Sequence, residues 1–592
     1  MALSRLRAAL GHRFMPVVLA VLAVALTLPS LDAGLIADDY YLRWTVMGSR
    51  DYQGIAPAPW DMWRFFDGNP QRTERMMDLG LLPWWTFPQL KGAFWRPVAA
   101  ATHVVDFRLW PQFPALMHAH SLLWFGLLVA CVAMLYRRLL APAWVAGLAG
   151  LLYAVDDAHG MPVAMLANRN ALLATLFGVL ALLAHDRWRR NRWAFGIVAG
   201  PALLAASLLS AEAGVGTCAY LLAYALFLDG GTRGRRFASL LPYAAVTLVW
   251  LILWNALGYG VYGIEEVYNS PFADPLGFAA LIVKRAPLYI LGQWALPPAE
   301  THLLLGKAGN LWLWVGGLAM LIILAVLLYP LCRRSKTARF WAAGMLLAVI
   351  PPCATGPMNR QLFFVGLGAM GLLAQFLQEV FSTPAQPAGR SALRKAAMCL
   401  GVVFIFIHLV IAPLGLVAFS KYPLGPKSVL AGFHNVPGMG PSVAGQDLVV
   451  VNHPLPVHMI HMLAGRVTAG QPVPRHTRVL ASSASRLTVY RPDDRTLLVR
   501  PAAGYCAQVS DRLARGLKHP MALGQQVTLT GMTVTVTELT ADNRPAEARF
   551  EFSVPLEDRS LLWIQWKDGA FRPFVPPAVG QTITLPAFTL PL

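Results

Sequence analysis

Long apolar segments recur along the 592-residue chain, and they restrict its possible folds more than any other feature. A helix that crosses a bilayer needs about 20 mostly apolar residues. Eleven segments approximately meet this requirement: 14–36, 116–136, 141–156, 170–185, 194–211, 213–228, 238–257, 310–330, 340–355, 361–381 and 398–420. Because backbone polar groups inside a bilayer must be paired within the protein, such segments form helices. We therefore expect a polytopic α-helical membrane domain over residues 1–421.

Composition excludes most other classes of protein. Hydrophobic residues make up 56% of the chain and charged residues only 13%, whereas soluble domains carry about 25% charge. A soluble multidomain enzyme and a disordered, collagenous or coiled-coil chain are therefore excluded. The net charge of +19 would suggest nucleic acid in a soluble protein. Here much of it lies in short loops between apolar segments, where membrane topology accounts for it, so we expect no nucleic-acid partner.

The basic loops also predict an orientation. With eleven spans, the clusters at 137–138, 187–192, 233–236, 333–339 and 390–395 fall on one side with the N-terminal arginines, and that side is cytoplasmic. Counting the apolar segment 279–296 as a span would place the cluster at 333–339 outside, and its Lys284 and Arg285 are costly in a bilayer. We therefore expect this segment to be re-entrant or interfacial. Arginine far outnumbers lysine, as in GC-rich bacterial genomes. We predict a bacterial inner-membrane protein with a cytoplasmic N-terminus and a periplasmic C-terminal domain.

Two large segments then lie outside the membrane: a first loop, 37–115, and the tail, 422–592. Short alternating runs in the tail, such as 526–536 and 581–585, predict strands, and Asp447–Asn452 predicts a buried strand before a short helix. We expect a β-rich exoplasmic domain built on an antiparallel sheet with one solvated face. Trp563 and Trp566 fit either its core or a sugar-stacking surface, and the core interpretation is favoured.

An acidic pair, Asp38 and Asp39, directly follows the first apolar segment. Carboxylates held close together raise each other's pKa, and this suits a general base that deprotonates a hydroxyl group. The simpler alternative is a pair of solvated loop acids at the start of a helix.

Further polar residues occur at the ends of apolar segments, all on the predicted exoplasmic side. They are Asp156, Asp157, His159, Arg169, Glu212 and Arg360, and Arg96 lies in the first loop on the same side. Ionisable residues in such places mark substrate sites, and guanidinium groups bind phosphate through two parallel hydrogen bonds. The alternative for each arginine is an anchor at the membrane surface. A base beside several guanidinium groups suits transfer from a polyprenyl-phosphate-linked sugar.

Carboxylate oxygens are also the ligands that Mg²⁺ and Mn²⁺ prefer. Asp39 and Asp157 are the candidate metal ligands, with Asp38 and Asp156 beside them. Arginines neutralise phosphate equally well, so the sequence permits a divalent cation without requiring one.

The stretches FWRPVAAATHVVDFRLW, ALMHAHSLLW, AVDDAHGMPVAMLANRNALLATLFGVLALL and SLLSAEAGV carry a family resemblance. They resemble the GT-C membrane glycosyltransferases, in particular the membrane part of the tetratricopeptide-repeat protein O-mannosyltransferase-like proteins, whose repeats this chain does not have. The resemblance implies that Asp39, with Asp38, is the catalytic base or a metal ligand. It also matches His159, Arg169 and Arg360 to family positions.

The expected activity is transfer of a sugar from a polyprenyl-phosphate donor to an acceptor hydroxyl of a protein, glycan or lipid, in contact with membrane lipids. Met161 stands where the family has glutamate, and Ala211 where it has lysine. These departures favour the alternative of a non-catalytic or transport protein that binds lipid-linked saccharide. A polymerase or ligase of surface polysaccharide is a third option.

Overall fold

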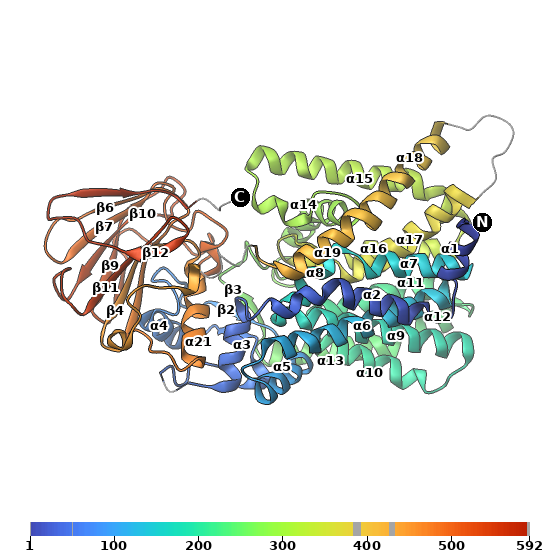
Figure 1. Ribbon diagram of the computed structural model, residues 1–592, viewed down its shortest axis with the longest axis horizontal. Coiled ribbons are helices and arrows are strands. Elements are labelled where there is room, and N and C mark those ends of the chain that lie inside the picture. The colour runs from blue at the N-terminus through green and yellow to red at the C-terminus, as the bar shows by residue number, and fades with distance from the viewer. Residues whose placement is uncertain (1, 50, 383–391, 426–431, 589–592) are drawn as a thin grey trace. The chain divides into compact units, whose positions relative to one another are not determined.

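The chain folds as two compact units, each made of three separate stretches. A computed structural model describes residues 2–49, 51–382, 392–425 and 432–588. The first unit comprises 1–35, 95–257 and 271–424, and the second comprises 36–94, 258–270 and 425–592. The first unit is helical, and the second contains the strands (Figure 1).

Apolar helices dominate the first unit. In chain order they are α1 (Ala2–Leu10), α2 (Met15–Thr27), α5 (Pro97–Leu109), α6 (Pro114–Leu139), α7 (Ala143–Ala154), α8 (Gly160–Ala164), α9 (Arg169–Asn191), α10 (Gly196–Leu208), α11 (Gly216–Phe227), α12 (Arg233–Ala238), α13 (Leu241–Ala256), α14 (Pro275–Trp294), α15 (Lys307–Arg334), α16 (Lys336–Ala348), α17 (Phe363–Ser382), α18 (Ala392–Phe406) and α19 (Ala412–Lys421). Short 3₁₀ turns follow several of them, including η3 (Asp157–His159), η5 (Glu212–Val215), η6 (Ala299–Leu303) and η8 (Asn359–Gln361).

The predicted multi-span membrane domain is confirmed. Among the described residues, nine helical segments are long and apolar enough to cross a membrane: Met15–Asp32, Pro114–Leu139, Leu166–Asn191, Arg233–Ala256, Pro275–Trp294, Lys307–Arg334, Lys336–Ala354, Phe363–Ser382 and Arg394–Lys421. Eight coincide with expected spans. The other three expected spans are shorter helices, α7, α10 and the segment Glu212–Phe227.

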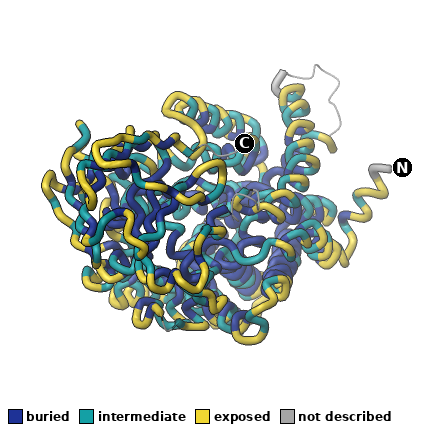
Figure 2. The backbone as a smooth tube through the Cα atoms, turned by 60° about the vertical axis from the view of Figure 1, so that its left-hand side comes forward, coloured by how far each residue is buried: buried dark blue, intermediate teal, exposed yellow. Residues whose placement is uncertain are grey.

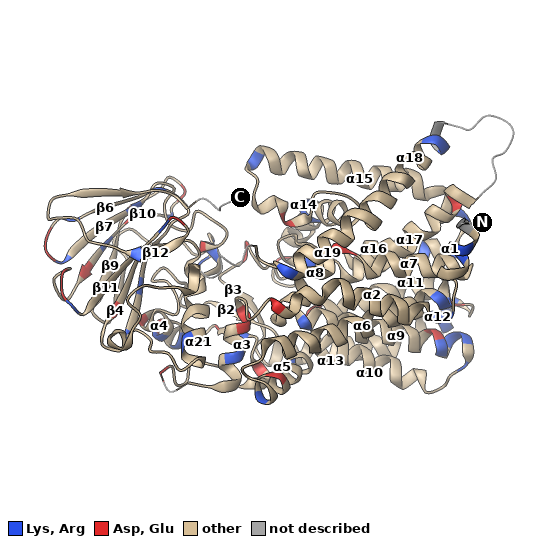
Figure 3. Ribbon diagram, viewed as in Figure 1, with Lys and Arg blue, Asp and Glu red and all other residues tan. Residues whose placement is uncertain are grey.

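The ninth long helix, α14, was expected to be re-entrant because of Lys284 and Arg285. In the structure, Arg285 Nη1 donates to the carbonyl oxygen of Cys353 at 2.8 Å, so part of the charge that argued against a span is paired inside the unit. By length and hydropathy α14 qualifies as a span. The count of eleven spans and the orientation stay predictions. Lysines and arginines do gather at the end of the helical unit near α1 and α12 (Figure 3).

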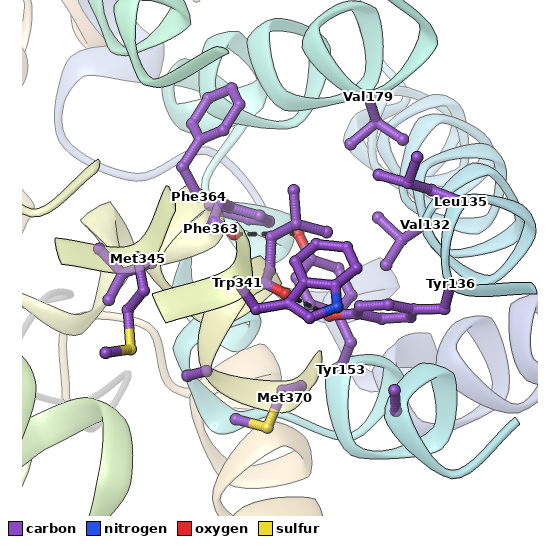
Figure 4. Packing of buried hydrophobic residues seen from close by; sticks show 14 of the residues in the cluster. Val132, Leu135, Tyr136, Tyr153, Val179, Trp341, Met345, Phe363, Phe364 and Met370 are labelled. Carbon is purple, nitrogen blue, oxygen red and sulfur yellow. Dashed lines mark hydrogen bonds between the residues drawn. The ribbon is translucent and has the colours of Figure 1, made fainter. Parts of the chain in front are cut away.

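Helix α17 is deeply buried in the helical unit. Of an 18-residue apolar stretch within it, 83% of the residues are buried. The Tyr136 hydroxyl donates to the Leu367 carbonyl oxygen at 2.6 Å, and the Tyr220 hydroxyl donates to that of Phe364. Figure 4 shows Tyr136 beside Trp341 of α16, and their ring centroids lie 5.1 Å apart. Buried segments run through both units in Figure 2. Tyrosine is suited to such places because an apolar ring carries one hydroxyl that finds a partner.

The second unit contains three sheets and the helices α3 (Asp38–Met47), α4 (Pro70–Leu79) and α21 (Met459–Thr468). The small sheet has the order β1-β2-β3, the larger ones β13-β6-β7-β10-β9-β8 and β12-β11-β4-β5. The strands are β1 (Arg64–Asp67), β2 (Lys91–Ala93), β3 (Gly260–Tyr262), β4 (Asp447–His453), β5 (His476–Ser482), β6 (Leu487–Tyr490), β7 (Thr496–Pro501), β8 (Gln526–Leu529), β9 (Met532–Leu539), β10 (Pro545–Phe552), β11 (Leu561–Lys567), β12 (Ala570–Pro573) and β13 (Thr582–Leu585).

The predicted β-rich tail is confirmed, and its six-stranded sheet is antiparallel throughout, as expected. The four-stranded sheet is mixed and was not predicted. Strand β4 runs parallel to both β5 and β11, and α21 forms the crossover between β4 and β5. Every residue of β4 is buried, as is typical of parallel strands covered on both faces. Trp563 and Trp566 are 7% and 4% exposed, so the core interpretation is confirmed for both and an open sugar-stacking surface on them is excluded.

Most of the first exoplasmic loop belongs to the second unit. The sequence predicts a boundary after residue 421, with the loop 37–115 in the membrane domain, whereas the structure groups 36–94 with the tail. The chain leaves α4 through Gly80, which adopts a left-handed φ of +80° and lies against the backbone of Thr477 in β5.

Replacement of Gly80 by alanine tests this packing. Its new Cβ would overlap the Thr477 carbonyl group, in addition to the strain of the left-handed backbone. Gly68→Ala is the matched control, because its φ is +84° but the nearest atom to its Cβ lies at 3.7 Å. We expect a loss of about 1 kcal/mol in the control and about 1–3 kcal/mol more in Gly80→Ala, measured by denaturant unfolding of the purified protein in micelles. Equal losses would contradict the packing.

Candidate functional site

The acidic pair begins helix α3 in the second unit. Asp39 has no exposed surface, and its Oδ2 accepts a hydrogen bond from the main-chain N–H of Ile36 at 3.0 Å. The preceding Ala37 has a φ of +47°, which is uncommon outside glycine. Asp39 is therefore not a solvated loop acid, and that alternative is wrong for it.

Asp38 lies beside a histidine that is not among the residues predicted from the sequence. Its Oδ1 is 3.1 Å from Nε2 of His461, which lies on α21. The side chain of Asp38 is 40% exposed, whereas that of His461 is 10% exposed. The two residues are 423 positions apart, which explains why sequence spacing gave no signal of this pair.

In the first unit, two predicted site residues form an ion pair. Nε and Nη2 of Arg96 donate to Oε2 of Glu212 at 2.9 and 2.8 Å. Arg96 immediately precedes α5, and Glu212 opens the turn before α11. Their side chains are only 18% and 27% exposed, so the charge of each residue is held in place by the other.

Asp156 and Asp157 follow the end of α7 and are both removed from water. Gln293 Nε2 donates to Asp156 Oδ2 at 2.8 Å, and Asn359 Nδ2 donates to Asp157 Oδ2 at 3.3 Å. Burial raises the pKa of both carboxyl groups, and the charge of Asp156 raises the pKa of Asp157 further. The pair therefore binds a proton more readily than ordinary aspartates do.

Arg360 lies in the 3₁₀ turn that leads into α17. Its Nη1 donates to Asn168 Oδ1 at 3.4 Å. The neighbouring Asn359 is fixed more firmly: its N–H donates to Glu300 Oε2, and its Oδ1 accepts from Ala299 N, both at 2.9 Å. Asn359, Gln293 and Glu300 were not among the predicted site residues, although Asn359 stands next to Arg360 in the sequence.

Arg169 is completely buried within the helical unit. Its Nη1 lies 2.5 Å from Asp106 Oδ2, its Nε donates to Ser121 Oγ at 2.9 Å, and its Nη2 donates to the Met117 carbonyl oxygen at 2.7 Å. Asp106 also contacts His120 Nδ1 at 2.7 Å. The guanidinium group thus ties α9 to α5 and α6. This geometry favours a positioning role over direct contact with phosphate.

His159 is packed among aromatic rings. Its ring stacks on Phe363 at a centroid distance of 4.6 Å, with Tyr153 at 4.6 Å and Phe125 at 5.4 Å. Neither ring nitrogen has a hydrogen-bond partner among the residues that the structure describes. Burial lowers the pKa of His159 to about 3, so the ring is neutral. The neutral ring can shape the site, but it cannot neutralise the charge of a phosphate.

The structure brings some predicted site residues together and separates others. Arg96 and Glu212 form an ion pair, and Asp156 and Asp157 are buried next to each other. Asp38 and Asp39 belong to the second unit. Within the described ranges, no three His, Cys, Asp or Glu side chains gather as a metal site would require. The proposed ligands Asp39 and Asp157 lie in different units, and the divalent cation stays a prediction.

No family model and no curated protein sequence matches this chain. Solved structures similar to it include the oligosaccharyltransferase of Archaeoglobus fulgidus, tethered to an acceptor peptide (13% identity, TM-score 0.39) and in the apo form (14%, 0.41), each with 79% of this chain covered. Another is the arabinofuranosyltransferase AftD from Mycobacteria (15%, 0.34), with 93% of this chain covered.

This chain spans 64% and 65% of the two archaeal chains and 42% of the mycobacterial one. Similarity at these values carries no information about substrate or site residues. The finer resemblance to tetratricopeptide-repeat O-mannosyltransferase-like proteins finds no support among the matches.

The buried Arg169–Asp106 pair yields a stability prediction. Asp106→Asn leaves the guanidinium charge buried without its counter-charge, and we expect a loss of about 3–5 kcal/mol in the free energy of unfolding. Glu551→Gln is the control, because the Arg549–Glu551 pair is 45% and 41% exposed and should contribute about 0–1 kcal/mol. Denaturant titration in micelles measures both. A loss in Asp106→Asn as small as in the control would contradict the positioning role of Arg169.

Proposed function

We propose that this protein is a membrane glycosyltransferase that moves a sugar from a polyprenyl-phosphate donor to an acceptor hydroxyl group on a protein, glycan or lipid. The observation that carries the proposal is the complete burial of Asp39 at the first turn of α3, directly after an apolar segment. A carboxylate is costly to remove from water. One held there by a main-chain N–H is suited to act on a substrate proton.

In this proposal Asp39 accepts the proton of the acceptor hydroxyl. The acceptor oxygen then forms a bond to the anomeric carbon of the sugar, while the bond from that carbon to the phosphate oxygen breaks. Polyprenyl phosphate departs with the bonding electron pair. Asp38, held near His461, would support the charge and orientation of the base.

The departing phosphate needs positive charge around it. Arg360 has one long hydrogen bond to Asn168, so its guanidinium group retains donors for a phosphate. Arg96 is a second candidate, with Glu212 fixing its direction. Because Arg169 is occupied by Asp106 and Ser121, we assign it to holding the helices that carry the site. Asp156, Asp157 and His159 would line the donor site.

The alternative from another class is a protein that binds or moves lipid-linked saccharide without chemistry. The commitment of Arg169 to a buried structural pair favours this alternative, because it removes one expected phosphate ligand. A surface-polysaccharide polymerase or ligase would use the same carboxylate on a different acceptor. The set of glycans that changes when Asp39 is replaced distinguishes these two alternatives from the main proposal.

Asp39→Asn should reduce transfer by about 10²–10⁴-fold, because the amide cannot accept the proton. The measurement compares membrane glycans, glycolipids and glycoproteins by mass spectrometry in the wild type, a deletion strain and strains complemented with each variant. Asp51→Asn is the matched control: it alters an exposed aspartate in the same loop and should restore the wild-type profile. Immunoblots establish equal amounts of protein.

Transfer by Asp39→Asn at the wild-type rate would overturn the assignment of the base. A deletion strain whose glycans and glycoproteins all remain unchanged would favour the non-catalytic alternative. Activity that is undiminished in excess chelator would exclude the divalent cation at Asp39 and Asp157.

A further inference from the structure

A groove of about 440 Å³ runs between α11 and α13 of the helical unit, at a place that the proposed transfer reaction does not use. One wall belongs to α11, and the other consists of Leu240, Tyr243, Ala244, Thr247, Leu248 and Leu251. Leu222 of α11 is 37% exposed, Leu248 is 57% exposed, and Ala244 is exposed too. Molecules next to the unit therefore reach the walls of the groove directly.

The groove exists because α13 is held mainly on one side. Of the 18-residue apolar stretch in the segment Arg233–Ala256, 11% is buried, the lowest share among the candidate spans in the described ranges. Helix α13 packs on α10, where Tyr243 lies against Gly200. Toward α11, Thr247 Oγ1 lies 3.6 Å from Cys218 Sγ, and the groove opens along this side.

The walls of the groove favour an apolar ligand. Thr247 Oγ1 already donates to the Tyr243 carbonyl oxygen at 2.9 Å, and the Tyr243 hydroxyl lies 3.3 Å from Nδ1 of His185. A polar ligand gains few hydrogen bonds in such a place, whereas a hydrocarbon chain needs none. The groove therefore suits the chain of a lipid.

The wall formed by α13 continues into a pair of arginines. Its residues follow one another three or four positions apart, which is the spacing of one helix face. Toward the N-terminus the same spacing reaches Arg236 and Arg233 in α12, whereas Arg235 falls on the opposite face. The two residues that join α12 to α13 have helical backbone angles, so this register is approximately kept. From Leu240 to Leu251 the apolar part of the face is about 17 Å long.

These arginines give the groove a positively charged end. Arg233 is exposed. Arg236 Nε donates to the Gly231 carbonyl oxygen at 2.6 Å, and a guanidinium group has further N–H donors. The nearest acid along the chain, Asp229, is paired with Arg189. An anion at this end, where Figure 3 shows basic residues near α12, therefore meets guanidinium groups that Asp229 does not neutralise.

The place of the charged end distinguishes two kinds of lipid. Helix α11 begins beside the turn that contains Glu212, a predicted site residue, and ends at Phe227, about 18 Å further along. The arginines follow that far end. In the proposed reaction the phosphate of a polyprenyl donor lies near the Glu212 end. A phospholipid of the other leaflet has its phosphate at the arginines, and basic residues next to a span attract anionic lipids.

We infer that this groove binds one anionic glycerophospholipid, with an acyl chain along α13 and the phosphate beside Arg233 and Arg236. The site lies within the helical unit and does not depend on the proposed transfer activity.

The test titrates lipids onto the full-length protein in detergent micelles and follows the first bound lipid by native mass spectrometry. The probes are palmitoyl-oleoyl phosphatidylglycerol, the phosphatidylcholine with the same chains, and undecaprenyl phosphate. Each nearby arginine should raise the affinity for an anionic headgroup about fivefold. Phosphatidylglycerol should therefore bind about 25-fold more tightly than phosphatidylcholine.

Two matched pairs of variants separate the groove from the surrounding surface. Ala244→Trp fills the groove and should abolish this binding of both phospholipids, whereas Ala245→Trp, outside the groove, should leave it unchanged. Arg233→Ala should weaken phosphatidylglycerol binding about fivefold, whereas Arg235→Ala, on the opposite face, should not. All four altered residues are exposed, so none of the changes removes a buried contact. Size-exclusion chromatography establishes that each variant is folded.

Four outcomes would overturn the inference. Equal affinity for the two phospholipids would remove the role of the arginines, and binding that survives Ala244→Trp would place the lipid elsewhere. Tighter binding of undecaprenyl phosphate than of phosphatidylglycerol would assign the groove to the donor lipid. A dimer that dissociates in Ala244→Trp would make the groove a protein interface. None of these outcomes bears on Asp39, so the transferase proposal stands or fails separately.

Discussion

Tyrosine hydroxyl groups that donate to carbonyl oxygens of α17 fix the centre of the helical unit. Tyr136 and Tyr220 come from two different helices and bond to carbonyls at Leu367 and Phe364. Inside an apolar bundle there is no water to replace a lost hydrogen bond. The rotation and height of α17 are therefore determined, and so is the position of the Asn359–Arg360 turn that precedes it.

The positions of the polar residues at the helix ends depend on the placement of α17. Asn359 contacts Asp157, and Gln293 contacts Asp156, so α14 and the turn before α17 together determine where two buried carboxyl groups lie. Low dielectric strengthens each of these contacts and also makes any unpaired member costly. Arg169 is also buried with all of its contacts inside the protein. Asp106, Ser121 and a main-chain carbonyl pair with its guanidinium group, and its role is structural.

Hydropathy predicted the membrane domain well, because each span is a local property of about 20 residues. At α14 hydropathy alone qualifies the helix as a span, whereas Lys284 and Arg285 argue against it, and the distant Cys353 carbonyl pairs part of that charge. Alternation of residues predicted the strands of the tail, because a period of two is a local property of the sequence. The parallel pairing of β4 was not predicted, because strand direction depends on partners far away in the chain.

The candidate site was predictable in its residue types but not in its pairings. Arg96, Glu212, Asp156 and Asp157 stood out because charged residues are rare beside apolar segments. That Arg96 would pair with Glu212, 116 positions away, had no local signal. Arg169 was identified by resemblance, yet its partner Asp106 had no motif of its own, although it is the only acid in FWRPVAAATHVVDFRLW.

The interleaving of the two units has a consequence for biosynthesis. Residues 36–94 leave the ribosome early, but α3 packs on α21 and Gly80 on β5, both more than 360 positions further along the chain. At about 5–20 residues per second, the roughly 390 residues from position 94 to the end of β5 take about 20–80 s to make. During that interval Trp84 and Trp85 have no partners from the tail. The early loop therefore cannot complete its packing until α21 and β5 have been made.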